Sequence, residues 1–314
     1  MSNKKVLCIK NSRVTYTKNM KLLIKLKIFL LVCICVLSSC CFYGCSTQKI
    51  KLYDINTNQI KTLSLEDYVA GVTAAEIDTS FSTQAIAAQS VIARTFALWF
   101  KNNNLCKYEG ADISNDITEA QAYTSDIPES IKKICNTTKG EVLKYNNKLF
   151  LPYYCSNCGG YSSLAQDVFN GNTSSYTSAV ETKETAENSK NYSWQATIEK
   201  STILHAMQKL NKSLASVNSF TIGKTDSSNR ALTFIVGGTE VNANDFRLAI
   251  GSTIFKSCKL TNIEISANSI TFSGLGYGHG VGLSQWGANI MGASNISYNN
   301  ILLYYYKNCQ IEKI

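Results

Sequence analysis

The pattern of hydrophobic and polar residues predicts two strands followed by two helices in the first third of the chain. Hydrophobic and polar residues alternate over residues 48–63, as in a pair of strands. Ser64 is a suitable cap for a helix that ends at about Glu76, and Ser82 is a suitable cap for a second helix to about Phe100. We therefore expect a short hairpin and an N-terminal helical pair.

The pattern changes to short strands from about residue 140 and returns to helix near the C-terminus. The strand-like segments are GEVLKY, KLFLPYY, SWQATI, SFTIG, ALTFIVGG and IEISANSITF. The C-terminal segments SQWGANIMG and YNNILLYYYK have helical spacing. Helices first, strands in the middle and helices last predict an α+β fold with a strand-rich central body, rather than a regular βαβ alternation.

The first 45 residues differ in composition from the rest. They contain eight Lys and Arg residues, no acidic residue, and an apolar run over residues 28–37, as in a secretory signal. The run ends in Leu37-Ser38-Ser39-Cys40, which is similar to the cleavage motif of bacterial lipoproteins, with Cys40 as the lipidated residue. An uncleaved anchor is the alternative, and Met1 and Met20 are both possible starts. Both interpretations divide the chain into a leader (1–45) and a globular part (46–314) on the extracytoplasmic face of a bacterial membrane.

The net charge of +9 comes almost entirely from this leader. Removal of its eight basic residues leaves 23 basic and 22 acidic residues, a net charge of +1. A nearly neutral globular part argues against a nucleic-acid partner, because binding to phosphates requires a basic surface.

Half of the twelve cysteines lie in the leader, and an even number remains for the globular part. An extracytoplasmic location permits disulfides but does not assign them. Cys155-Ser156-Asn157-Cys158 is a CxxC motif, and the chain has only two histidines. The remaining cysteines are Cys106, Cys135, Cys155, Cys158, Cys258 and Cys309.

Three long segments carry a resemblance to a known family. They are YVAGVTAAEIDTSFSTQAIAAQSVIARTFAL (68–98), PYYCSNCGGYSS (152–163) and GLGYGHGVGLSQWGANIMG (274–292), with DFRLAIGSTIF (245–255) as a weaker fourth. In this order they resemble the stage II sporulation protein D family, peptidoglycan lytic transglycosylases that share a domain with amidase-enhancer proteins. The resemblance implies that the N-terminal helical pair and the C-terminal helices line a substrate groove.

Glu76 is the expected catalytic acid. Cleavage of a glycosidic bond needs a carboxylic acid that stays protonated near neutral pH. Glu76 falls at the predicted C-terminal end of a helix, where the helix dipole disfavours the carboxylate and raises its pKa. On this pattern alone a solvated residue at a helix end is the favoured interpretation, and the resemblance reverses it in favour of catalysis. The acids Asp78, Asp167 and Asp245 in the matching segments are interpreted as structural.

The glycine-rich stretch 276–282 is expected to form a loop that a sugar chain approaches closely. His279 lies between two of these glycines, which suggests exposure, and we interpret it as a substrate-binding residue rather than a proton carrier. Ser284 and Gln285 follow as further substrate-binding candidates, and Ser284 is also a suitable helix cap. Trp286 is either a stacking platform for sugars or part of the core.

Three further residues are expected to bind substrate. Gln89 and Arg94 lie on the second predicted helix, five positions apart, so they point in different directions. Arg94 is suited either to pairing with Glu76 or an acidic substrate group, or to a structural ion pair. Tyr154, immediately before the CxxC motif, is expected to line the groove.

A metal site known from some clostridial relatives is not expected here. Those relatives carry a cysteine and histidine cluster before a stretch that corresponds to residues 114–123, and this chain has Ser, Glu and Ala at the ligand positions. Cys155 and Cys158, with Cys106 or Cys135, are the candidates for a substitute zinc site, but they do not make a convincing set of four ligands. Disulfides or free thiols are the favoured interpretation, and no cofactor is expected.

Together these features predict a membrane-attached lytic transglycosylase. Its expected partners are peptidoglycan glycan strands, a cell-wall amidase and, through the N-terminus, the membrane. The expected setting is engulfment during sporulation, with another wall-opening process as an alternative. A glycan-binding protein that stimulates an amidase without catalysis is the second hypothesis.

Overall fold

The computed structural model describes residues 48–169 and 174–314, so the predicted leader and Cys40 lie outside the described residues. Residues Lys49–Ile314 form one compact unit. This unit contains both helices and strands, which confirms the α+β class. Among the described residues, no helix combines the length and hydrophobicity that crossing a bilayer requires.

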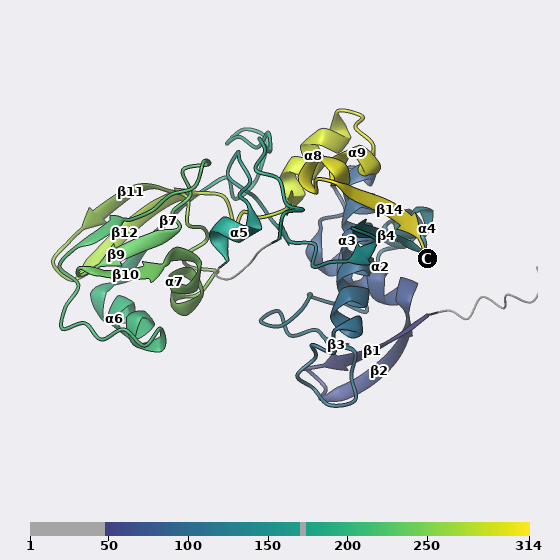
Figure 1. Cartoon of the computed structure of the whole chain (residues 1–314), viewed down its shortest axis with the longest axis horizontal. Coiled ribbons are helices and arrows are strands. Elements are labelled where there is room, and N and C mark those ends of the chain that lie inside the picture. Colours follow the sequence, from purple (N-terminus) through teal and green to yellow (C-terminus); the bar gives the residue numbers. More distant parts are fainter. Residues whose placement is uncertain (1–47, 170–173) are drawn as a thin grey trace, which may run out of the picture. The chain divides into compact units, whose positions relative to one another are not determined.

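The N-terminal elements follow the predicted order of strands and helices (Figure 1). They are β1 (Lys49–Asp54), β2 (Gln59–Ser64), α2 (Leu65–Glu76), α3 (Thr83–Asn102), β3 (Ile113–Ser114) and α4 (Glu129–Thr137). Strands β1 and β2 are antiparallel, and β3 joins β1 in parallel. The Oγ of Ser64 accepts the N–H of Asp67 at the start of α2, and the Oγ of Ser82 accepts the N–H of Ala85 at the start of α3. Both predicted helix caps are confirmed.

The second half of the chain is richer in strands. Its elements are β4 (Glu141–Tyr145), β5 (Lys148–Leu149), β6 (Tyr154–Cys155), α5 (Ala165–Val168), β7 (Ser193–Glu199), α6 (Lys200–Lys209), β8 (Phe220–Ile222), β9 (Thr233–Val236), β10 (Thr239–Asn242), α7 (Ala243–Ile250), β11 (Leu260–Ile265), β12 (Ser269–Leu275), β13 (Leu283–Ser284), α8 (Gln285–Ala293), α9 (Tyr298–Tyr305) and β14 (Cys309–Lys313). Helices α4, α5, α6 and α7 were not predicted from the sequence.

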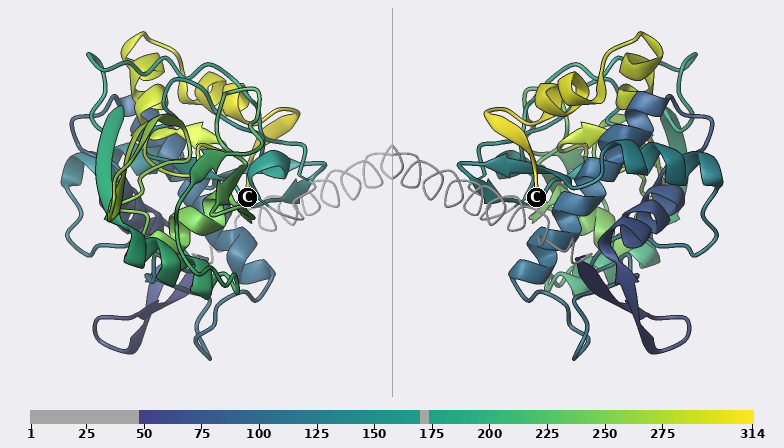
Figure 2. Two further views of the ribbon diagram at one scale, coloured as in Figure 1. Left: turned by 90° about the vertical axis from the view of Figure 1, so that its left-hand side faces the viewer. Right: turned by 90° about the vertical axis from the view of Figure 1, so that its right-hand side faces the viewer.

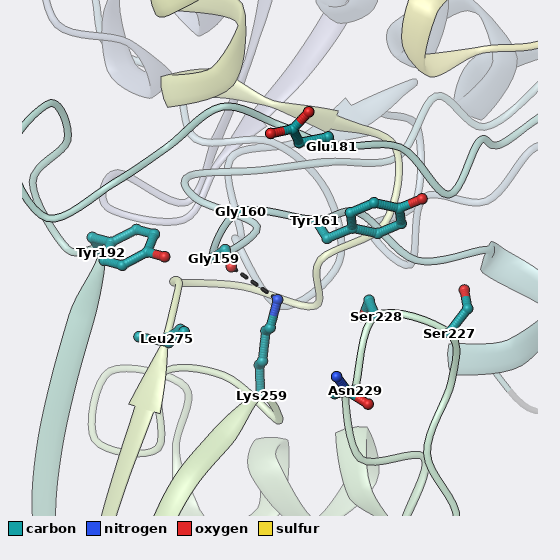
Figure 3. Close-up of a pocket in the computed structure, with 10 residues that line it drawn as sticks. All are labelled: Gly159, Gly160, Tyr161, Glu181, Tyr192, Ser227, Ser228, Asn229, Lys259 and Leu275. Carbon is teal, nitrogen blue, oxygen red and sulfur yellow. Dashed lines mark hydrogen bonds between the residues drawn. The ribbon is translucent and has the colours of Figure 1, made fainter.

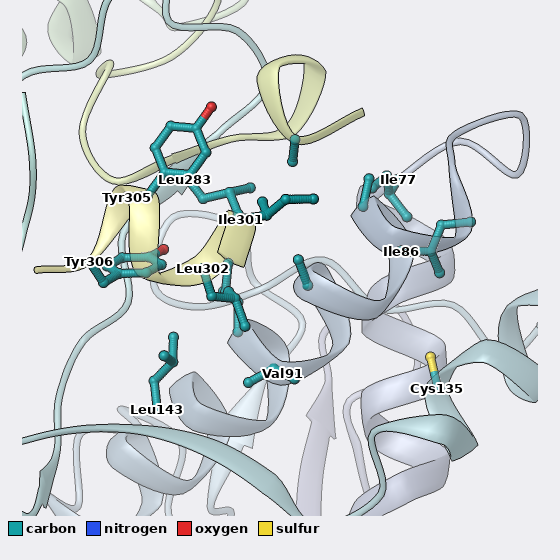
Figure 4. Close-up of a cluster of buried hydrophobic side chains, with 14 of the residues drawn as sticks. Ile77, Ile86, Val91, Cys135, Leu143, Leu283, Ile301, Leu302, Tyr305 and Tyr306 are labelled. Atoms are coloured by element: carbon teal, nitrogen blue, oxygen red, sulfur yellow. The ribbon is translucent and has the colours of Figure 1, made fainter. Parts of the chain in front are cut away.

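Helix α3 lies at the centre of the helical part of the core. It carries five alanines, whose small side chains let α2, α4, α8, α9 and β4 approach it from different sides. Figures 1 and 2 show the C-terminal helices beside α3. Figure 4 shows that buried side chains of α3 and of the C-terminal part of the chain pack together in one hydrophobic cluster. Among them are Ile86, Val91, Leu283, Ile301, Leu302, Tyr305 and Tyr306.

A second hydrophobic cluster belongs to the strand-rich part. Two three-stranded sheets, in the orders β11-β12-β7 and β10-β9-β8, contribute to it together with α6 and α7. Its centre consists of aromatic rings whose centroids lie 4.8–5.8 Å apart, mostly edge to face. These rings belong to Phe220, Phe234, Phe246, Phe255 and Phe272.

Two segments that are distant in the sequence, the one with β6 and the one with β13, run side by side. Strand β6 pairs in parallel with β13, so that Tyr154 lies opposite Leu283. Asn157 and Tyr277 form an isolated bridge in the same region. The pairing places the CxxC motif against the glycine-rich stretch, and both segments contribute to the site described next.

Candidate functional site

A cavity of about 720 Å³ opens at the C-terminal end of α2. Glu76 and His279, which are 203 residues apart in the sequence, both line it. Its remaining walls are mainly aromatic and apolar, with a few polar groups, as is typical of a ligand site. They come from Phe96, Trp99, Phe100, Leu105, Ile117, Thr118, Glu119, Ala120, Ala122, Leu151, Pro152, Tyr153, Tyr154 and Phe169.

Glu76 is the last residue of α2, as predicted, and its side chain is half-buried. The backbone N–H of Ala122 donates to its Oε1 over 3.1 Å. The side chains of Tyr154 and Gln285 also form hydrogen bonds to the carboxyl group. Burial raises the pKa of Glu76, and these hydrogen bonds oppose the rise only in part. The direction is the one that a general acid requires.

Tyr154 belongs to a chain of polar side chains behind Glu76. The Nε2 of Gln121 donates to the Tyr154 hydroxyl over 3.4 Å, and the hydroxyl of Tyr68 donates to Gln121 Oε1 over 3.5 Å. The Tyr154 hydroxyl therefore accepts from Gln121 and donates to Glu76. Tyr154 also lines the cavity, so it is placed both to hold the carboxyl group and to contact a ligand.

Gln285 and Gln89 support Glu76 from inside the protein. Gln285 Nε2 donates to Gln89 Oε1 over 3.4 Å, and Gln89 has no exposed surface. Neither residue lines the cavity. The prediction that they bind substrate is therefore corrected: Gln285 positions the catalytic candidate, and Gln89 lies behind it. Trp286 packs edge-on against Phe81 in the core cluster, with ring centroids 4.8 Å apart.

His279 lies in the cavity wall, but it is less accessible than its flanking glycines suggested. Its Nδ1 accepts the N–H of Val281 over 3.0 Å. The rings of Tyr153 and Phe169 meet it edge-on, with centroids 6.0 and 5.3 Å away. Burial, with the nearby positive charges of Arg247 and Arg230, lowers the pKa of His279 to about 3. The imidazole is neutral at physiological pH, and it is held by the N–H of Val281 and by the backbone of Tyr154, so it is not suited to proton donation.

Arg94 does not reach the cavity. Its guanidinium is fully buried and forms a two-pronged ion pair with Glu66, with Nη2 to Oε2 at 2.5 Å and Nε to Oε1 at 3.1 Å. Its Nη1 donates to the carbonyl of Glu141 over 2.9 Å. The prediction of a substrate contact or a pair with Glu76 is corrected in favour of the structural ion pair.

Ser284 is also structural. It is buried, and its Oγ accepts the N–H of Gly287 over 3.3 Å, which confirms the predicted cap of α8. The same hydroxyl donates to Glu184. Because both its hydrogen-bonding directions are used inside the protein, the predicted substrate contact is corrected.

The glycine-rich stretch serves the packing of the protein itself more than contact with a sugar. A Cβ at Gly282, where φ is +70°, would overlap the carbonyl oxygen of Tyr153. A Cβ at Gly278, where φ is +123°, would lie 2.5 Å from Cys155 Cβ. The glycines therefore let this stretch lie directly against the segment that carries Tyr153, Tyr154 and the CxxC motif.

Some residues of the cavity were missed by the sequence analysis. Glu119 is a second carboxyl group in its wall, but both oxygens are occupied: Oε1 accepts the N–H of Lys107 and Oε2 accepts the hydroxyl of Ser114, each over 2.5 Å. Ile117 lies three-quarters exposed at the same wall. An apolar residue within the polar stretch 114–119 was the available signal.

No group of three or more metal-binding side chains occurs in the part of the chain that the structure describes. Cys155 and Cys158 lie side by side, with their sulfur atoms 3.3 Å apart. Immediately after them, Gly159 and Gly160 line a second cavity of about 510 Å³ (Figure 3). There the Nζ of Lys259 donates to the carbonyl of Gly159 over 2.9 Å.

Comparisons with known proteins show which family this chain resembles. A family model described as stage II sporulation protein matches residues 53–145. Stage II sporulation protein D of Bacillus subtilis is 27% identical over 85% of this chain and 80% of its own length. The chain is similar to the stage II sporulation protein D family over most of its length. The resemblance inferred from the sequence is thereby confirmed.

Other relatives extend the comparison beyond sporulation protein D itself. An uncharacterised protein of Brachyspira hyodysenteriae is 28% identical over 80% of this chain and 67% of its own length. The amidase enhancer of Bacillus subtilis is 28% identical over 75% of this chain, which spans only 39% of that protein. The names of these relatives connect the family with sporulation and with enhancement of an amidase. The matched residues 53–145 include Glu76, whereas Tyr154 and His279 lie outside them.

Proposed function

We propose that this protein is a peptidoglycan lytic transglycosylase with Glu76 as its catalytic acid. The observation that carries the proposal is the position of Glu76: a half-buried carboxyl group of raised pKa in the wall of a large, aromatic cavity. The reaction cleaves the bond between N-acetylmuramic acid and N-acetylglucosamine and leaves a 1,6-anhydro end on the muramic acid.

A single carboxyl group is sufficient for this chemistry. Protonated Glu76 donates to the glycosidic oxygen as the bond breaks. The resulting carboxylate then accepts the proton of the 6-hydroxyl as that oxygen closes onto the anomeric carbon, which restores the acid. No water is consumed, so no second carboxylate is needed to activate one. This agrees with the engagement of Glu119 by Lys107 and Ser114.

The cavity walls suit a glycan. Aromatic side chains offer stacking surfaces for the apolar faces of sugar rings, and Trp99, Tyr153 and Phe169 supply them here. The neutral imidazole of His279 adds a further ring to the same wall. Tyr154 lies between this wall and Glu76.

The test is digestion of purified glycan strands stripped of their stem peptides. We expect the wild-type protein to release fragments with anhydro ends, detected by mass spectrometry. Glu76→Gln should release about 100- to 10,000-fold less, because the proton donor is lost. Asp78→Asn is the matched control, since Asp78 is an exposed carboxyl group two residues away. Equal product from Glu76→Gln would show that another group is the acid.

A second candidate function is that of a glycan-binding amidase enhancer without catalysis. The similarity to the amidase enhancer of Bacillus subtilis favours it. This hypothesis predicts that the wild-type protein binds denuded strands, forms no anhydro ends, and accelerates an added cell-wall amidase. The same digestion therefore separates the two functions.

The membrane location and the setting of the activity belong to the same proposal. Cys40 is the proposed lipidation site, and engulfment is the proposed process, with a cell-wall amidase as the partner that prepares the strands. Metabolic labelling with a fatty acid tests the first point: wild-type protein should incorporate the label and Cys40→Ala should not.

A further inference from the structure

The CxxC motif has no part in the proposed reaction, yet the structure brings its two sulfur atoms together. Cys155 ends strand β6 and is 6% exposed, and Cys158 is fully buried three residues later. Their Sγ atoms are 3.3 Å apart. Since a disulfide has a bond length of about 2.05 Å, the sulfur atoms need to approach by only about 1.2 Å to form one.

The surroundings hold this pair in place. The N–H of Cys158 donates to Glu184 Oε1 over 3.2 Å, and its carbonyl accepts from Arg230 Nη2 over 2.7 Å. On the other side of the motif, Gly278 packs so closely that a Cβ at its position would lie 2.5 Å from the Cβ of Cys155. The backbone on both sides of the motif is therefore fixed in the geometry that places one thiol against the other.

A metal ion fits this environment poorly. Structural zinc sites use four ligands, and within the described residues no third Cys, His, Asp or Glu joins the two cysteines in a metal-binding group. Glu184, the nearby carboxyl group, is already occupied by the backbone N–H of Cys158 and by the hydroxyl of Ser284. Two facing thiols without further ligands suit a disulfide.

We propose that Cys155 and Cys158 are joined by an intramolecular disulfide in the exported protein. The oxidant is the disulfide of an extracytoplasmic thiol oxidoreductase. The Cys155 thiolate attacks that disulfide and releases one of its sulfur atoms as a thiol. The Cys158 thiolate then attacks Cys155 Sγ in the mixed disulfide and releases the second. Two electrons and two protons leave the chain, and the oxidoreductase gains two thiols.

The two thiols have different surroundings in the folded chain. The hydrogen bond from Cys158, helped by the charge of Arg230, lowers the pKa of the Cys155 thiol, whereas burial raises the pKa of Cys158. Because both thiols are buried in the folded chain, the exchange takes place before the segment is covered. Once formed, the bond is shielded from reductants.

The bond would tie together two parts of the candidate site. Tyr154, which contacts Glu76, immediately precedes Cys155, and Gly159 of the second cavity immediately follows Cys158 (Figure 3). A cross-link between them fixes the segment that connects the two cavities. In this respect the inference rests on the proposed function, but its test does not.

The test is the redox state of the full chain as exported by a bacterial host. The protein is quenched in acid, denatured and alkylated without reductant, and then digested and analysed by mass spectrometry. We expect the peptide with Cys155 and Cys158 to carry no alkyl group and to weigh about 2 Da less than the dithiol, by the loss of two hydrogens. After reduction of the denatured protein, both residues should be alkylated.

Cys258 is the internal control, because it is similarly buried but has no sulfur neighbour among the described residues. Its alkylation shows that denaturation has exposed the buried cysteines to the reagent. In the Cys155→Ser variant, Cys158 should become alkylated. Alkylation of both Cys155 and Cys158 in the exported wild-type protein, with or without bound zinc, would overturn the proposal. Because the readout is a mass and not an activity, this result is independent of whether the protein cleaves glycan.

Discussion

The hydrogen bond between Tyr154 and Glu76 makes a quantitative prediction for the Tyr154→Phe variant. The substitution keeps the aromatic ring in the cavity wall and removes only the hydroxyl. Burial is the main cause of the raised pKa of Glu76, and the Tyr154 hydroxyl is the strongest group that opposes it. Loss of this donor destabilises the carboxylate relative to the acid, so the pKa of Glu76 rises further.

The size of the change follows from the strength of a hydrogen bond to a charged group, about 1.5–3 kcal/mol. One pKa unit corresponds to 1.36 kcal/mol, which gives a rise of about one to two units. The lower end applies because Glu76 is only half-buried, and the Ala122 N–H and Gln285 remain as donors. Since the protonated form is the active one, the alkaline limb of the pH profile of kcat/KM should move up by about one unit.

The assay is release of anhydro ends from denuded glycan strands across a range of pH. Tyr145→Phe is the matched control, because its hydroxyl contacts Ser175 and not the site, and its profile should coincide with that of the wild type. If the alkaline limb of the pH profile stays in place and only KM increases, Tyr154 contacts the substrate without changing the pKa of Glu76. A limb that moves to lower pH would refute the electrostatic argument.

Three further predictions concern stability, measured by urea unfolding or thermal midpoints. Glu66→Ala leaves the buried guanidinium of Arg94 unpaired and should cost about 3 kcal/mol; a loss below 1 kcal/mol would contradict a structural role. Gly282→Ala should destabilise more than Gly238→Ala, because only the first places a Cβ against backbone atoms, and the second should cost about 1 kcal/mol for its positive φ. Glu76→Gln should raise the midpoint at pH 7. A carboxyl group with a raised folded-state pKa destabilises the fold once ionised, so this gain should disappear below the unfolded pKa of about 4.5.

The local features of the fold could be predicted from sequence because they depend on neighbouring residues. Ser64, Ser82 and Ser284 each cap the helix that follows them, as expected from their type and position. Helix α6 was missed because its sequence, KSTILHAMQK, directly continues strand β7 without a capping side chain. Its N-terminal residue, Lys200, bonds instead to Asn268 from the turn between β11 and β12, a contact between distant parts of the chain.

The candidate site was predicted in part. Glu76, Tyr154 and His279 line one cavity, but Arg94 and Ser284 turned out to be buried structural residues. The reason is that a motif identifies residues that a family needs, and a structural ion pair or helix cap is as necessary as a ligand contact. Which of these roles applies depends on the side to which a helix or strand turns each residue, and that is fixed by packing.

The groups that form hydrogen bonds to Glu76 approach it from two sides. Gln285, itself bonded to Gln89, reaches Glu76 from the interior, whereas Tyr154 reaches it from the cavity wall. All the named donors to the carboxyl group therefore stabilise its ionised form, and burial alone keeps the proton on it. In such an arrangement the carboxylate that forms when the proton is donated is already supplied with hydrogen bonds, so the charge created in the reaction needs little rearrangement of the protein. In the proposed reaction, the opposed effects of burial and hydrogen bonding would let one carboxyl group act first as acid and then as base.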